Sequence, residues 1–78
     1  MQKFEWDETK NRANISKHGI DFAFASRIFA SFTLNREDKR FDYGETRIIS
    51  TGCVDGIAVL VVVHPARFGP CRILSARH

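Results

Sequence analysis

The chain has 78 residues, 44% of them hydrophobic, and a formal net charge of +3 at pH 7. This length allows one domain with a thin core, and the composition argues against disorder. No apolar run reaches the roughly 18 residues of a membrane-spanning helix, so we expect a cytoplasmic protein, whose mild basic bias is compatible with nucleic acid.

Residues 1–19 predict a short strand followed by an unusually polar helix. The strand covers 2–6, where apolar and polar residues alternate. Asp7 is a suitable N-cap, and Gly19 is suited to the left-handed conformation that ends many helices. The apolar residues between them are Ala13 and Ile15. Because this helix has so little to bury, we expect it to present a surface to a partner.

Polar residues with helical spacing form one face of this helix. Lys10, Asn14 and Lys17 stand at i, i+4 and i+7. Lysine and asparagine commonly contact nucleic-acid backbones, so we predict that Lys10, Lys17 and the adjacent His18 bind RNA. The alternative is a solvated face on which His18 only complements the helix end.

The next segment predicts a second helix, a short strand and a loop. Asp21 caps a helix over 22–30, in which phenylalanine and alanine recur with the spacing of core residues. A short strand follows at 32–35. The charged stretch 35–45 mixes both signs and is typical of a solvated connection.

The remaining chain predicts a β-hairpin and a final strand. Strands over 47–54 and 57–64 flank Asp55-Gly56, a pair that favours a two-residue turn. Residues 71–77 form the last strand. The expected order is β-α-α-β-β-β-β, an α+β fold with two N-terminal helices packed on one face of a mainly antiparallel sheet.

The hairpin suggests where chemistry takes place. A two-residue turn pairs Arg47 with His64 on the sheet face that the helices leave open. If Arg72 lies opposite His64, the three residues form a row across three strands. If the last strand slips by one residue, Arg77 joins the open face instead, near Ala58. We predict that Arg77, like the residues of the polar helix, binds RNA. We favour the Arg72 register because it buries the apolar residues of that strand.

A row of arginine, histidine and arginine suits RNA cleavage without a metal ion. Arginines hold a phosphate and offset the charge that grows on its oxygens when the 2′-hydroxyl attacks. A histidine moves protons near neutral pH, and Glu45 or Tyr43 would supply the second proton-transfer group. The alternative is an ordinary polar pair at strand ends. The sequence has no metal-ligand spacing and no glycine-rich phosphate loop, so we predict no metal or cofactor.

Four stretches together resemble the BrnT family of bacterial toxins: FEWDETKNRANISKHGIDF at 4–22, DYGETR at 42–47, VVVH at 61–64 and RILSAR at 72–77. The resemblance implies a RelE-like fold, an RNA-cleaving toxin that inhibits translation, and a tight complex with a DNA-binding antitoxin similar to BrnA. Direct contact with DNA is expected only through that complex. The positions that match the family are Lys17, His18, Arg47, His64, Arg72 and Arg77.

Family members usually continue past the SAR segment with a basic residue and a charged helix. The resemblance therefore implies a single toxin domain over 1–78 without this helix. The boundary of this chain, a natural truncation and a weakened toxin are three alternative explanations. Two alternatives remain open. One is a non-catalytic module with the toxin fold that only binds RNA or an antitoxin, and the other is a domain with no nucleic-acid function.

Overall fold

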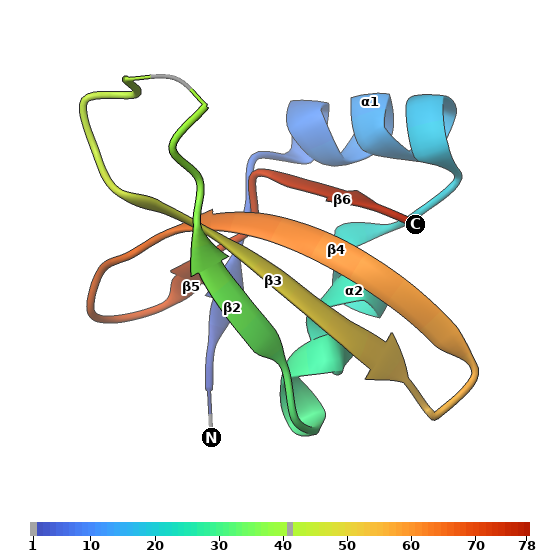
Figure 1. The fold of residues 1–78 in the computed structure, drawn as a ribbon. Helices are drawn as coiled ribbons and strands as arrows, with labels where there is room; N and C mark the ends of the chain where they lie inside the picture. The colour runs from blue at the N-terminus through green and yellow to red at the C-terminus, as the bar shows by residue number, and fades with distance from the viewer. Residues whose placement is uncertain (1, 41) are drawn as a thin grey trace.

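The computed structural model describes residues 2–40 and 42–78, which form an α+β fold (Figure 1). The elements are β1 (Phe4–Glu5), α1 (Glu8–His18), α2 (Phe22–Ala25), the 3-10 helix η1 (Ser26–Ala30), β2 (Leu34–Glu37), β3 (Arg47–Val54), β4 (Ala58–Pro65), β5 (Cys71–Arg72) and β6 (Ser75–Arg77). The predicted fold class and element order are confirmed. No helix within the described residues is long and apolar enough to cross a membrane.

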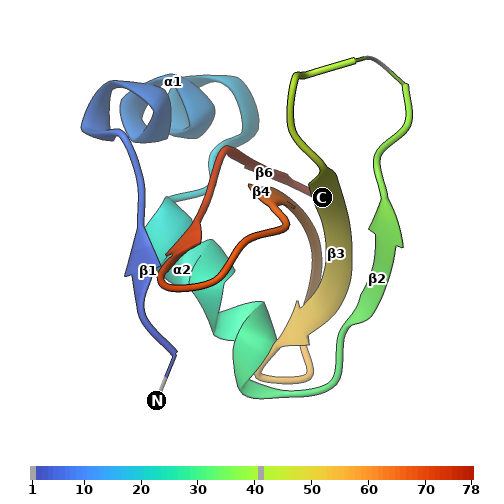
Figure 2. The same cartoon turned by 90° about the vertical axis from the view of Figure 1, so that its left-hand side faces the viewer.

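The strands form two sheets. Four of them make an antiparallel sheet in the order β2-β3-β4-β6, while β1 pairs in parallel with β5. The single last strand expected at 71–77 is therefore divided between the two sheets. Figure 2 shows α2 on one side of the large sheet, and we call the opposite side the open face. In the described part of the chain, no helix covers that face.

The capping signals of the sequence work as expected. The carboxylate of Asp7 accepts hydrogen bonds from the backbone N–H groups of Thr9 at 2.8 Å and Lys10 at 3.3 Å. Gly19 ends α1 with a φ of 70°. The second helix starts in the same way, with the backbone N–H of Ala23 donating to the carboxylate of Asp21. These caps satisfy donors that the first turn of a helix leaves without partners.

The polar helix α1 is anchored by buried amides rather than by apolar side chains. Asn11 and Asn14 are both buried. The side chain of Asn11 accepts from the backbone N–H of Phe22 at 2.9 Å, and Asn14 donates to the carbonyl of Ile20 at 2.9 Å. The amide of Asn14, which we expected to contact a partner, is therefore occupied by hydrogen bonds within the protein, although Asn14 also lines a surface cavity with Lys10 and Lys17.

The core lies between the helices and the covered face of the large sheet. Its buried residues are Ile20, Phe22, Ala25, Ile28, Val54, Leu60, Val62, Ile73 and Ala76. On this face β3 approaches η1 closely at Gly52. A Cβ atom there would lie 3.0 Å from Cγ2 of Thr33 and 3.1 Å from Cβ of Ile28, so glycine permits the contact.

The hairpin turn forms where the sequence predicts it, but the strands pair one residue further along. Asp55 and Gly56 have φ values of 53° and 70°, and the backbone N–H of Ile57 donates to the carbonyl of Val54 at 3.0 Å. The strand register, however, pairs Val54 with Ala58. Ile57 stays in the turn as an extra, exposed residue. Since successive side chains alternate in direction, this slip reverses both faces of β4.

Candidate functional site

His64 lies on the covered face of the sheet, not on the open face. It pairs with Ile48, and its ring meets Phe29 edge-on with 5.4 Å between ring centres. Its Nε2 atom is 2.8 Å from the hydroxyl oxygen of Ser50. Burial lowers the pKa of His64 below its ordinary value of 6.5. The predicted pairing of Arg47 with His64 is therefore wrong, because the extra turn residue shifts the register.

Arg72 does not complete the predicted row either. It belongs to β5, where it pairs with Glu5, and its guanidinium lies 3.5 Å from that carboxylate. The chain leaves this pairing at Ile73, whose side chain is fully buried. The chain then forms β6, which pairs with β4 and places Arg77 opposite Val61. Arg77 thus lies on the open face, because the shifted hairpin turns its partner Val61 to that face; the last strand itself follows neither predicted register.

Basic side chains and a buried isoleucine meet on the open face. Arg36 of β2 pairs with Ile49 of β3, and Ile49 pairs with Val63 of β4. Directly opposed residues of neighbouring strands point to the same side of a sheet. Arg77 lies on this side as well, one row further along. Ile49 is only 5% exposed, although it is on the open face.

A cavity of about 400 Å³ lies beside Arg36, Ile49 and Arg77, and we call it the arginine groove. Its lining consists of Arg36, Glu37, Asp38, Lys39, Arg40, Ile49 and Arg77. Four of the seven lining residues are cationic, so the groove is suited to an anionic ligand. Arginine guanidinium groups offer paired N–H donors that match the geometry of a phosphate.

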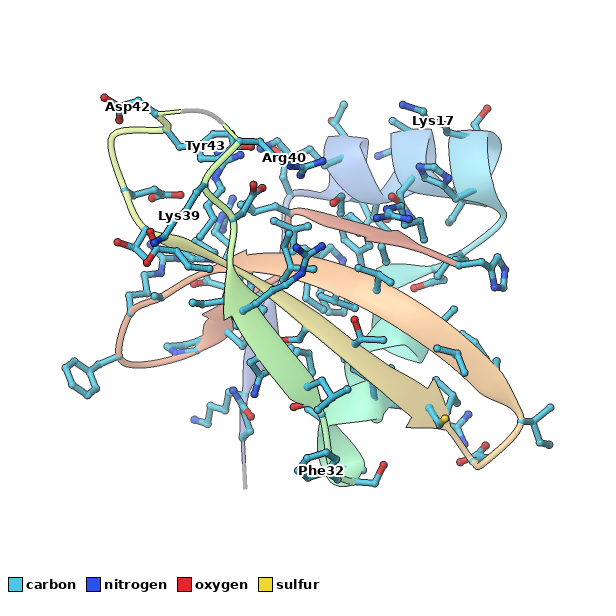
Figure 3. All side chains as sticks on the ribbon, viewed as in Figure 1. Lys17, Phe32, Lys39, Arg40, Asp42 and Tyr43 are labelled. Carbon is cyan, nitrogen blue, oxygen red and sulfur yellow. The ribbon has the colours of Figure 1, made fainter. Side chains whose placement is uncertain are left out.

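A second cavity of about 490 Å³ adjoins the arginine groove. It is lined by Glu37, Asp38, Lys39, Asp42, Tyr43, Glu45 and Thr46. The residues from Glu37 to Lys39 line both cavities and form their shared rim. Figure 3 shows Lys39, Arg40, Asp42 and Tyr43 on the loop between β2 and β3, with Lys17 apart from them on α1.

Asp38 is the centre of a hydrogen-bond network at this rim. Its side chain is 1% exposed, and its carboxylate accepts from Nε and Nη2 of Arg40 at 2.9 and 2.8 Å. The hydroxyl of Tyr43 donates to the same carboxylate at 3.0 Å. Hydrogen bonding from Arg40 holds the pKa of Asp38 far below its usual range, and the pKa of Arg40 is raised in turn.

Arg47 joins this network through an aromatic ring. Its guanidinium carbon lies 3.9 Å from the ring centre of Tyr43, and its Nε atom lies 3.4 Å from the carboxylate of Glu45. A cation over a tyrosine ring is attracted by the negative face of the ring. The structure thus brings together Arg47 and the two residues that the sequence suggested for proton transfer, without His64.

Three residues predicted to bind RNA line a separate cavity beside α1. Lys10, Lys17 and His18 surround a space of about 300 Å³, which also contacts Leu74 and Ser75. The fourth, Arg77, lies in the arginine groove. The structure therefore groups the predicted helix residues, but separates them from the predicted arginine.

The sequence reasoning missed most of the arginine groove because it assigned 35–45 to a solvated loop. In the structure β2 extends to Glu37, which directs Arg36 onto the open face. Two signals were available. Apolar and polar residues still alternate at Leu34 and Asn35, and the single tyrosine of the chain lies inside the charged stretch. The hydroxyl of a tyrosine that is partly buried usually has a hydrogen-bond partner.

Comparisons with known proteins agree with one another. The family model described as "Ribonuclease toxin, BrnT, of type II toxin-antitoxin system" matches residues 6–78. The 1.1 Å crystal structure of the ribonuclease toxin BrnT of Brucella abortus is similar to this structure, with a TM-score of 0.70 and 25% sequence identity. The match covers 99% of this chain and 95% of that one. No curated protein sequence matches the chain.

Proposed function

The chain belongs to the BrnT family of ribonuclease toxins of type II toxin–antitoxin systems, and we propose that it cleaves RNA in the arginine groove without a metal ion. By cutting RNA in the cytoplasm it would inhibit translation. The observation that carries this proposal is the gathering of Arg36, Arg40 and Arg77 around one concave site.

The chemistry follows from the charges of the groove. When the 2′-hydroxyl attacks the adjacent phosphorus, negative charge grows on the phosphate oxygens that do not bridge nucleotides. Arg36 and Arg77 would bind these oxygens and stabilise that charge. Both side chains reach the groove from strands, which hold their positions better than a loop would.

Two groups that line the second cavity suit the proton transfers. Glu45 would accept the proton of the attacking 2′-hydroxyl, while the ammonium group of Lys39, which lines both cavities, would donate a proton to the leaving 5′-oxygen. The products would be a 2′,3′-cyclic phosphate and a 5′-hydroxyl. His64 and Arg72 take no part in this scheme, since both lie outside the two cavities.

The cavity beside α1 extends the proposed contact with RNA. Lys10, Lys17 and His18 would bind backbone phosphates away from the cleaved bond. Such contacts position the strand without selecting its sequence. The chain would therefore hold a single-stranded segment across β6, between this cavity and the arginine groove.

We further propose that a DNA-binding antitoxin similar to BrnA neutralises the chain by covering the arginine groove. Membership of a type II toxin–antitoxin family supports an antitoxin partner. A net charge of +3 favours an acidic partner segment at this site. Expression of the chain is expected to arrest growth, and co-expression of the adjacent antitoxin gene is expected to restore it.

The direct test is incubation of the purified chain with a defined single-stranded RNA in the presence of EDTA. We expect new RNA ends that carry a cyclic phosphate, and their loss in Arg36→Ala. Arg27→Ala is the matched control, because Arg27 is an ion-paired arginine outside both cavities. Binding of RNA without new ends would contradict cleavage and favour the non-catalytic module. Cleavage that stops in EDTA would contradict metal independence.

A further inference from the structure

We propose that Asp38 is a positioning residue, which directly fixes Arg40 in the arginine groove and, through Tyr43, fixes Arg47 at the start of β3. The proposal rests on the function proposed above and assigns Asp38 no contact with RNA. It explains why an acidic residue is completely enclosed at a site that is otherwise suited to phosphate.

The contact with Asp38 fixes one edge of the Arg40 guanidinium. Asp38 receives the Nε and Nη2 donors of Arg40. A guanidinium has five N–H donors in a rigid plane; Arg40 also forms a side-chain hydrogen bond with Tyr43, so about two donors remain. The side chain of Arg40 is 61% exposed, whereas that of Asp38 is 1% exposed. The unused donors of Arg40 are therefore accessible from the groove, and the carboxylate is not.

The contact with Arg47 runs through two links. Asp38 accepts from the hydroxyl of Tyr43 at 3.0 Å, and the Tyr43 ring lies under the Arg47 guanidinium at 3.9 Å. The backbone adds a second link, because the N–H of Asp38 donates to the carbonyl of Arg47 at 2.8 Å. One carboxylate thus connects an arginine of the loop with an arginine at the start of β3.

The charge of Asp38, and not only its shape, is needed for this role. Arg40 stands among Arg36, Lys39 and Arg77, so an unpaired guanidinium would be repelled by its neighbours. The carboxylate offsets that repulsion and holds Arg40 in one orientation before RNA arrives. Orientation fixed in advance lowers the cost of ordering the groups during the reaction.

The first experiment measures kcat and KM for cleavage of a defined RNA by Asp38→Asn, Arg40→Ala and the double variant. We expect Asp38→Asn to lower kcat about tenfold, in line with the loss of one positioning contact. The double variant should cleave at most about twofold more slowly than Arg40→Ala, because the two residues act as one unit. Asp55→Asn, which removes the carboxylate of the Arg27 ion pair, is the matched control and should leave kcat unchanged.

Additive losses in the double variant would overturn the proposal. So would a lower melting temperature in Asp38→Asn with an unchanged kcat for the folded fraction, since that result describes a purely structural residue. Tyr43→Phe keeps the ring and removes the hydroxyl, and it should reproduce part of the loss in kcat. A kcat equal to wild type in Tyr43→Phe would remove the link from Asp38 to Arg47.

A second measurement separates this proposal from the proposed function. The side-chain Nε–H signals of Arg40 and Arg47 can be followed by NMR in the absence of RNA. Both should exchange slowly with water in the wild type, and both should exchange faster in Asp38→Asn. If the wild type cleaves no RNA, the proposed function fails while this measurement still decides the role of Asp38. An Arg47 signal unaffected by Asp38→Asn would refute the coupling.

Discussion

The side-chain amide of Asn14 and the backbone of Ala76 bind each other in both directions. Nδ2 of Asn14 donates to the carbonyl of Ala76 at 2.9 Å, and the N–H of Ala76 donates to Oδ1 of Asn14 at 3.2 Å. The amide takes the place of a neighbouring strand at this edge of β6. The next residue is Arg77, so this contact between α1 and β6 also supports the arginine groove.

Asn14→Ala should therefore destabilise the protein and weaken cleavage together. Removing the amide leaves buried backbone groups of Ala76 and Ile20 without partners, which costs about 1–3 kcal/mol in free energy of unfolding for each unsatisfied group. Denaturant unfolding measures this loss. Ser16→Ala, on the exposed side of the same helix, is the control and should change stability little. A variant as stable as the wild type would contradict the role of this amide.

The elements of the fold were predictable because their signals are local. Asp7, Gly19 and Asp21 act locally, through hydrogen bonds to residues two to four positions away in the chain. The turn at Asp55-Gly56 is local in the same sense. The two buried asparagines were not predictable in this way. Their partners include Ala76, 62 positions along the chain, and only the complete fold brings them together.

The candidate site was predicted less well because it depends on strand register. One extra residue, Ile57, remains in the turn and moves His64 to the covered face. The hydrophobic periodicity of the sequence predicts that two strands pair, but it does not give the number of residues in the turn between them. Arg47 lies on the open face as predicted, because β3 keeps its predicted bounds. Arg77 also lies there, as the alternative had it, but because the shifted hairpin turns its partner Val61 to that face.

Arg77→Ala should reduce cleavage strongly with little effect on folding. If Arg77 stabilises the charge that grows on the phosphate, kcat/KM should fall by about 10²–10³-fold, as for the loss of one transition-state donor. Initial rates on a defined RNA, together with circular dichroism, would measure both effects. Arg27→Ala serves again as the control. Equal rates for wild type and Arg77→Ala would exclude Arg77 from the reaction.

The lysines of α1 should contribute to RNA affinity through charge alone. For single strands the logarithm of the binding constant falls with the logarithm of salt concentration by about 0.7 per phosphate contact. The double variant with Lys10→Ala and Lys17→Ala should therefore show a slope smaller by about 1.4, two such contacts. Fluorescence anisotropy over a salt series measures this. Lys3→Ala, an exposed lysine outside the cavity beside α1, is the control, and an unchanged slope in the double variant would argue for a solvated face.

His64 should make the protein less stable in mildly acidic solution. Burial lowers the pKa of His64 in the folded state below its ordinary value of 6.5, so the unfolded chain takes up a proton more readily. The free energy of unfolding should therefore decrease as the pH falls from about 6.5 towards the folded-state pKa. Urea unfolding at several pH values would follow this, and His64→Gln should remove this part of the pH dependence. If the free energy of unfolding of His64→Gln decreases with falling pH in the same way, groups other than His64 cause the decrease.

The division of the last strands has a consequence for how the protein is made. Residues 71–77 complete both sheets, since β5 pairs with β1 in the two-stranded sheet and β6 pairs with β4 in the four-stranded sheet. A ribosome synthesises these residues after the elements from β1 to β4, and Arg77 is added after the other side chains of the arginine groove. Domains fold as their chain emerges, so the groove stays incomplete until Arg77 has left the exit tunnel. The proposed cleavage site is thus absent during most of the synthesis of this domain.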